Sequence, residues 1–165
     1  MAVVLGTGAL AGCGGGSSGS AGGSTTAATV AAPPVAKPPP NAEEGTVFVS
    51  LGNVAGLGQV LVDSEGHTLY AFGADSDGKS ACEGACAKAW PALLVEHGEP
   101  EPSNGASAAR LGTVTRADGS HQVTYAGHPL YAFTGDKQPG EANGDGSTAF
   151  GGTWTALQGS GSPAG

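Results

Sequence analysis

The chain has 165 residues, of which 31 are glycine and 11 are proline, and 14 acidic residues against 6 basic ones give it a formal net charge of −8. This length predicts a single domain. The acidic balance and the lack of a Lys or Arg cluster exclude the nucleic-acid-binding proteins, which need a basic surface to neutralise phosphates.

The N-terminus predicts export and lipid attachment. Residues 2–10 are small or apolar and lead into Leu10-Ala11-Gly12-Cys13, which resembles a bacterial lipobox, the cleavage motif whose cysteine receives acyl chains. We expect residues 1–13 to be the lipoprotein signal peptide with its lipobox, and Cys13 to carry the lipid, palmitate included. No later segment has the ~20 consecutive apolar residues that span a bilayer, so we expect the lipid to be the attachment to the cell membrane.

The composition then predicts a tether. Residues 14–44 are rich in Gly, Ser, Thr and Ala and afterwards in proline, ending near Pro38-Pro39-Pro40. Such a segment cannot build a core, and we expect a disordered spacer. Residues 159–165 have a similar composition and are expected to fray. The folded domain is therefore predicted at 45–158.

A duplication organises this domain. The string GHTLYAFGAD at 66–75 returns as GHPLYAFTGD at 127–136. An internal repeat of this kind predicts two copies of one structural unit. We place the first repeat at about 45–95 and the second at about 108–158.

Both copies have the pattern of β-structure. Short β-branched and alternating segments bounded by turn residues predict strands, near 59–63, 68–72, 112–116, 122–125 and 130–133. The predicted fold is mainly β, with two pseudo-symmetric β-meander repeats that share one core. Tyr70 and Phe72 should point to one face of their strand, as should Tyr131 and Phe133. We expect these aromatic pairs to stack across a pseudo-twofold axis as core, rather than to form a ligand-binding platform.

One short helix is predicted near 80–90. Ser80-Ala81-Cys82-Glu83 fits a capping box, and Pro91 ends the segment. Cys82 and Cys86 would then lie on one helical face. In an exported protein they are expected to pair as a disulfide that staples the helix, and the alternative is a reduced pair that binds a metal ion.

The repeated motif resembles a known family. Each copy contains Tyr-x-aromatic-x-x-Asp, and the matching residues are Tyr70, Phe72, Asp75, Tyr131, Phe133 and Asp136. Together with Cys82-x-x-x-Cys86-x-x-x-Trp90-Pro91 and Phe150-Gly151-Gly152-x-Trp154, these residues are similar to those of a bacterial family of secreted-repeat lipoproteins of unassigned function. The resemblance covers nearly all of 45–157. It implies an extracytoplasmic lipoprotein with paired repeats. Some chains that resemble this one are linked to envelope or respiratory systems, so the resemblance also leaves a redox or metal-binding role as an alternative.

Several residues could hold a cofactor. Cys82 and Cys86 with a histidine are similar to the copper site of respiratory copper-delivery proteins, and thiolate and imidazole ligands suit copper. His67 and His128 hold equivalent positions in the two copies and are the candidate ligands for a metal ion or haem, with His97 and His121 also available. Calcium is a weaker alternative, because residues 141–146 resemble the opening of a calcium loop, although polar residues also stabilise turns without an ion.

No catalytic motif is recognisable in the sequence. We expect Asp75 and Asp136 to accept backbone N–H bonds after their strands rather than to act as an acid pair. The leading prediction is a monomeric, membrane-anchored extracytoplasmic lipoprotein that acts as a non-enzymatic binding or structural module toward an envelope protein or small ligand. The alternative is a metal- or haem-linked redox accessory that uses Cys82, Cys86 and a histidine.

Overall fold

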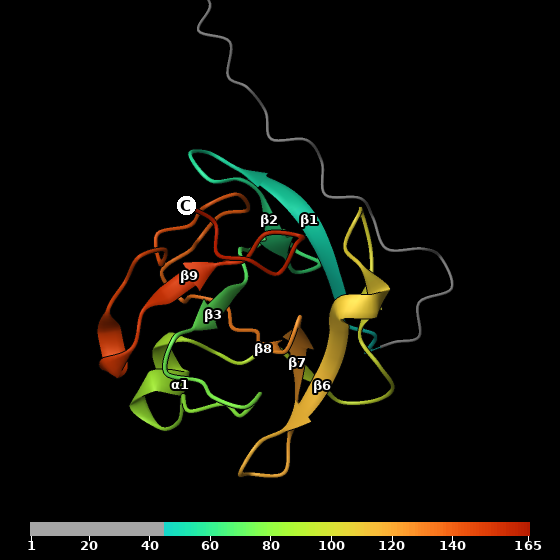
Figure 1. Cartoon of the computed structure of the whole chain (residues 1–165), viewed down its shortest axis with the longest axis vertical. Coiled ribbons are helices and arrows are strands. Elements are labelled where there is room, and N and C mark those ends of the chain that lie inside the picture. Colours follow the sequence, from blue (N-terminus) through green and yellow to red (C-terminus); the bar gives the residue numbers. More distant parts are fainter. Residues whose placement is uncertain (1–44) are drawn as a thin grey trace, which may run out of the picture. The chain divides into compact units, whose positions relative to one another are not determined.

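The computed structural model describes residues 45–165, and the lipobox, Cys13 and the predicted tether lie outside the described residues. The fold is mainly β, as predicted, with one short α-helix (Figure 1). Its elements are β1 Phe48–Val54, β2 Gly58–Val62, β3 Tyr70–Phe72, α1 Ala85–Ala89, β4 Leu94–Val95, β5 Glu101–Pro102, η1 Ala108–Arg110, β6 Leu111–Thr115, β7 His121–Tyr125, β8 His128–Pro129, η2 Ala149–Gly151 and β9 Trp154–Ala156.

The strands form three small sheets. β1 pairs antiparallel with β2 and parallel with the short β5. β7 lies between β6 and β4 and also pairs with β8. β3 and β9 form an antiparallel pair. The hairpins β1–β2 and β6–β7 therefore open the first and second repeat in the same way, and each is followed by one copy of the repeated motif.

Each repeat ends with a segment that hydrogen-bonds to the other repeat. In the second repeat, β9 pairs with β3 of the first (Figure 1), and the register places Phe72 opposite Trp154. In the first repeat, β4 pairs with β7 of the second, so that Leu94 lies opposite Gln122. The sheets of both repeats are thus completed by the exchange of their last strands.

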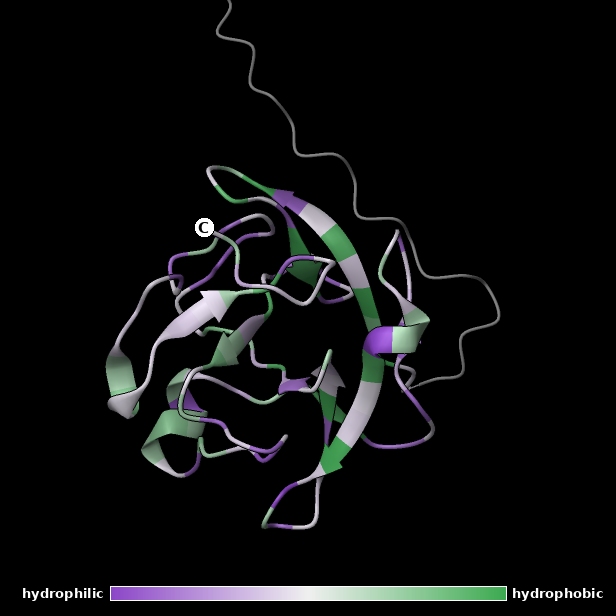
Figure 2. Ribbon diagram, viewed as in Figure 1, coloured by the Kyte–Doolittle hydropathy of each residue, from purple (hydrophilic) through white to green (hydrophobic). Residues whose placement is uncertain are grey.

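The interior is shared by both repeats. One cluster of buried residues joins Tyr70, Phe72 and Trp90 of the first repeat to Tyr131 and Trp154 of the second. A second cluster gathers mostly aliphatic residues, again from both repeats: Val49, Leu61, Leu69, Ala71, Val95, Val123, Tyr125, Leu130 and Leu157. Figure 2 shows hydrophobic colouring on β2 and along parts of β1 and β6, and hydrophilic colouring in many of the loops. The prediction of one shared core is confirmed.

The helix is shorter than predicted. α1 begins at Ala85 and is preceded by Gly84 at φ 58°, with no side-chain cap. The capping-box prediction is wrong because the hydroxyl of Ser80 lies 2.7 Å from the hydroxyl of Tyr131 instead. Cys82 consequently precedes the helix, and only Cys86 lies on it.

The described part of the chain also has no strand at the predicted range 130–133. β8 covers only His128–Pro129, and Tyr131 makes isolated bridges to Tyr70 on one side and Ala92 on the other. Since the neighbours of Tyr131 do not continue either ladder, no strand forms around it.

The C-terminal tail does not fray as predicted. Leu157 bridges Pro163, and the N–H of Ala164 donates to the carbonyl of Ala156 at 2.8 Å. Ala164 is buried in the aromatic cluster. Glycine at 161 permits this return, because its φ of 84° lies in the left-handed region.

Within residues 45–165, no helix has the length and apolar character needed to cross a membrane.

Candidate functional site

The motif tyrosines meet at the centre of the molecule. Tyr70 and Tyr131 form an antiparallel bridge, with the N–H of Tyr70 donating to the carbonyl of Tyr131 at 2.8 Å and the reciprocal bond at 3.0 Å. The bridge relates two residues at equivalent positions of the two copies, as a pseudo-twofold axis requires. This isolated bridge therefore brings both copies of the motif to one place.

The tyrosine hydroxyls cross over to the aspartates of the opposite repeat. Tyr70 donates to Oδ2 of Asp136 at 2.6 Å, and Tyr131 donates to Oδ2 of Asp75 at 2.9 Å. Oδ1 of Asp75 also accepts the backbone N–H of Ala81 at 2.7 Å, and Oδ1 of Asp136 accepts the backbone N–H of Asn143 at 2.8 Å. The predicted bonds from the backbone are confirmed, whereas the crossed tyrosine bonds were missed, because no sequence signal relates a tyrosine of one copy to the aspartate of the other.

The aromatic rings form a continuous stack between the repeats. The rings of Trp90 and Trp154 stack face to face at the centre, with centroids 3.9 Å apart. Phe72 stacks on Trp154 at 4.1 Å, and Phe133 stacks on Trp90 at 4.3 Å. The predicted aromatic core is thus present, but the two motif phenylalanines contact tryptophans rather than each other.

The tyrosines complete the stack from its sides. Tyr70 meets Trp90 edge-on at 5.3 Å, and Tyr131 meets Trp154 edge-on at 5.2 Å. Edge-to-face contacts place the positive rim of one ring against the negative face of the other. All six rings therefore belong to the packing of the interface, which supports the core interpretation over an open platform for ligands.

Burial keeps both phenols protonated. It raises the pKa of Tyr70 far above its ordinary value, and the nearby Asp136 carboxylate adds to the effect. Burial likewise raises the pKa of Tyr131 to about 12. The two tyrosines are therefore hydrogen-bond donors over the physiological pH range and not phenolate nucleophiles.

Asp75 and its surroundings form the more polar of the two sites. Burial raises the pKa of Asp75, while the N–H of Ala81, the hydroxyl of Tyr131 and the charges of Arg116 and His128 oppose that rise. Arg116 has a side chain only 7% exposed. Its guanidinium donates to Gln122 Oε1 at 2.6 Å and to the carbonyl of Cys82 at 2.7 Å, and contacts the hydroxyl of Ser80.

The two cysteines form a disulfide, as predicted. The Cα atoms of Cys82 and Cys86 are 5.3 Å apart, and both side chains are buried, with exposures of 0% and 6%. Both sulfurs lie in the aromatic core cluster. In this oxidised state neither sulfur is a thiolate, so the pair offers no ligand for the copper site considered above.

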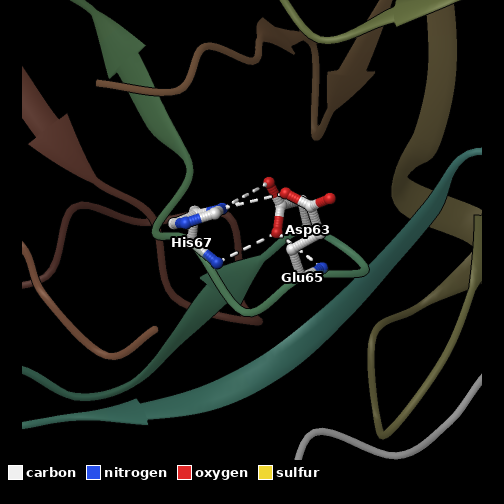
Figure 3. A group of neighbouring side chains, drawn as sticks. All are labelled: Asp63, Glu65 and His67. Atoms are coloured by element: carbon white, nitrogen blue, oxygen red, sulfur yellow. Dashed lines mark hydrogen bonds and ion pairs between the residues drawn. The ribbon is translucent and has the colours of Figure 1, made fainter. Parts of the chain in front are cut away.

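The structure does not bring the predicted histidines together. Within residues 45–165, one group of three potential metal ligands is close enough to share an ion, and it joins His67 to Asp63 and Glu65 (Figure 3). His128 is not part of that group. The Asp-x-Glu-x-His spacing of this turn was the sequence signal that could have identified the two carboxylates.

The remaining histidines line a surface hollow. His97 and His121 lie at its wall with Glu96, Glu99 and Thr113, around a volume of about 420 Å³. His121 lies opposite Val95 in the β4–β7 pair, which explains its closeness to the loop after β4. This hollow is polar and open, and no three of its carboxylates and imidazoles are close enough together to share one ion.

The acidic residues of the predicted calcium loop hold the backbone instead. Oε2 of Glu141 accepts the N–H of Lys137 at 2.6 Å, and Oδ1 of Asp145 accepts the N–H of Ala156 at 2.8 Å. These bonds are typical of polar residues that stabilise turns. Calcium binding here stays a prediction.

Comparison with known proteins gives one match. The profile of one protein family matches residues 54–94 and 112–158, and that family is described as a secreted repeat of unknown function. The two matched segments fall within the two repeats. Neither the curated proteins nor the solved structures contain a match to this chain.

Proposed function

Because the chain belongs to the family of secreted repeats of unknown function, we propose that it is an extracytoplasmic lipoprotein anchored through acyl groups on Cys13. In this proposal it acts as a non-enzymatic binding or structural module of the cell envelope. Family membership supports the location outside the cytoplasm. The buried Cys82–Cys86 disulfide agrees with it, because disulfides persist in oxidising compartments.

The crossed tyrosine–aspartate bonds carry the proposal of a binding or structural role. The tyrosines and aspartates of the repeated motif bond to each other across the repeat interface, and the aspartates also bond to the backbone of their own repeat. Asp136 is 6% exposed, and both tyrosines are fully buried. The motif thus specifies how the two repeats assemble, and a partner would bind to the surface around this core.

The anchor is tested by labelling in cells. We expect the wild-type protein to incorporate a palmitate analogue and to fractionate with membranes, and a Cys13→Ser variant to lose both properties. The double variant Cys82→Ser/Cys86→Ser is the matched control, because it changes cysteines without touching the lipobox and should still be labelled. Unlabelled wild-type protein in the cytosol would contradict the proposal.

The redox alternative requires a different chemical state of the cysteines. Thiolates at Cys82 and Cys86 would have to form by reduction of a buried disulfide before they could bind copper. Purification from native membranes under reducing conditions, followed by metal analysis and a visible spectrum, tests this state. Stoichiometric copper or haem that is lost in Cys82→Ser or His67→Ala would favour the redox accessory, and an intact disulfide without either would favour the binding module.

A further inference from the structure

Three side chains that commonly bind metals meet at the turn after β2 (Figure 3). Asp63, Glu65 and His67 each offer one ligand atom, and the three atoms lie within 4.8 Å of one another. Nδ1 of His67 is 3.4 Å from Oδ2 of Asp63 and 3.5 Å from Oε2 of Glu65. Two carboxylates and an imidazole therefore point at a common space.

These separations are the ones that ligands of a single ion show. A tetrahedral zinc ion with bonds of about 2.1 Å to nitrogen and oxygen places neighbouring ligand atoms about 3.4 Å apart. The two measured separations, 3.4 Å and 3.5 Å, agree with that value. An ion can therefore be accepted without a large movement of the three side chains.

The turn holds the Asp63 carboxylate in the required direction. Its Oδ1 accepts the N–H groups of Glu65 and His67, both at 2.9 Å, which leaves Oδ2 directed at the imidazole. The second repeat holds the turn in place. The carbonyl of Gly66 accepts the N–H of Gly140 at 3.2 Å, and the hydroxyl of Thr68 donates to the carbonyl of Glu141 at 2.6 Å. The Asp63 carboxylate and the backbone of the turn are thus positioned before any ion arrives.

We propose that Asp63, Glu65 and His67 bind one divalent transition-metal ion of the class represented by zinc. One imidazole and two carboxylates match the preference of such ions for mixed nitrogen and oxygen ligands. Three protein ligands leave coordination positions for water or for a ligand that bridges to another molecule. The side chains of His67 and Glu65 are accessible, at 28% and 77% exposure, so an ion can enter from solvent.

The charge of the chain favours the binding of a cation. The net charge is −8, and the ion pairs that Asp63 and Glu65 form within residues 45–165 are both with His67. No lysine or arginine competes there with an incoming ion. The proposal does not depend on the lipid anchor, so it can fail or succeed separately from the proposed function.

Calorimetric titration of the metal-free, full-length protein with zinc chloride tests the site. We expect His67→Ala to lose one bound equivalent of zinc or to bind it at least about tenfold more weakly. Removal of a residue that only hydrogen-bonds to a metal ligand already weakens metal binding by about tenfold or more. His128→Ala is the matched control, because it removes the equivalent histidine of the second repeat, whose turn, Ala126-Gly127, carries no carboxylate. This control should bind zinc like the wild type.

Two further variants separate ligand loss from loss of the fold. Asp63→Asn keeps an oxygen that accepts the two backbone N–H bonds but removes the anionic ligand, and Glu65→Gln removes the second charge at an exposed position. Both should weaken zinc binding while the melting temperature of the metal-free protein stays near that of the wild type. Zinc binding that is absent from the wild type, is retained by His67→Ala, or is lost only with His97→Ala and His121→Ala would overturn the proposal.

The nitrogen that binds is a separate prediction. Long-range ¹H–¹⁵N spectra should show that zinc shifts the Nδ1 resonance of His67, because that nitrogen faces both carboxylates. A shift confined to Nε2 would contradict the proposed geometry.

Discussion

Tyr70 and Tyr131 occupy equivalent positions in the two repeats and make the same bond to the aspartate of the opposite copy, but their surroundings differ. Asp136 receives the Tyr70 hydroxyl and the N–H of Asn143 in a nearly closed interior. Asp75 receives the Tyr131 hydroxyl beside Ser80 and Arg116, in a half-exposed polar network. The duplicated motif therefore maintains the contact across the interface, while the residues around it have diverged.

The central tryptophans give the largest expected effect and test the equivalence of the two repeats. Trp90→Ala and Trp154→Ala should each lower the free energy of unfolding by about 3–5 kcal/mol, because each removes a buried ring that contacts three others. Chemical denaturation measures both values. Phe150→Ala is the control, since this ring is 50% exposed and should cost less than ~0.5 kcal/mol. Clearly unequal costs for the tryptophans would break the symmetry of the stack.

The aspartates should give a smaller and unequal effect. Asp136→Ala leaves the buried Tyr70 hydroxyl without an acceptor and should cost about 1–3 kcal/mol. Asp75→Ala should cost about 1 kcal/mol, because the Tyr131 hydroxyl keeps its partner Ser80. Melting temperatures of the two variants, with the exposed Glu99→Ala as control, give the order. If Asp75→Ala were the more damaging, the polar network would be more important than burial.

The last expected effect is a change in pH dependence. Since the pKa of Tyr131 is raised to about 12 in the folded protein, against the ordinary value of 10.0, its contribution to stability is complete below pH 10 and is lost as the pH rises toward 12. One such proton changes the free energy of unfolding by about 1.4 kcal/mol per pH unit in that window. Tyr131→Phe should therefore show a shallower loss of stability from pH 10 to 12 than the wild type, measured by urea unfolding. An unchanged slope would show that Tyr131 does not titrate in this way.

The parts of the fold that depend on local pattern were predictable from the sequence. β2 and β7 lie close to their predicted ranges because each has two β-branched residues in a short segment that turn residues bound, Val60 and Val62 in β2 and Val123 and Thr124 in β7. The duplicated motif predicted the shared core and its aromatic character. The disulfide followed from the number of cysteines expected in an exported chain.

The parts that depend on contacts between the repeats were not predictable in this way. Ser80 was predicted to cap the helix, but its hydroxyl forms a hydrogen bond with the hydroxyl of Tyr131, 51 residues later in the chain. The C-terminal tail has the composition of a coil, yet Ala164 is buried because β9 holds it by a backbone bond. At the candidate metal site, His67 was identified from its position in the motif. The Asp-x-Glu-x-His spacing offered Asp63 and Glu65 as its partners, but only the geometry of the turn shows that the three ligand atoms lie within 4.8 Å of one another.

The exchange of terminal strands has a consequence for the origin of the duplication. The strand pairing and the tyrosine–aspartate bonds across the axis are reciprocal: each copy gives the other a terminal strand and a hydroxyl, and receives the same in return. A polypeptide with one copy would expose its half of the ring stack and an unpaired sheet edge. A second identical polypeptide could cover the rings and pair with the edge. The chain therefore has the architecture of a strand-swapped homodimer contained in one polypeptide.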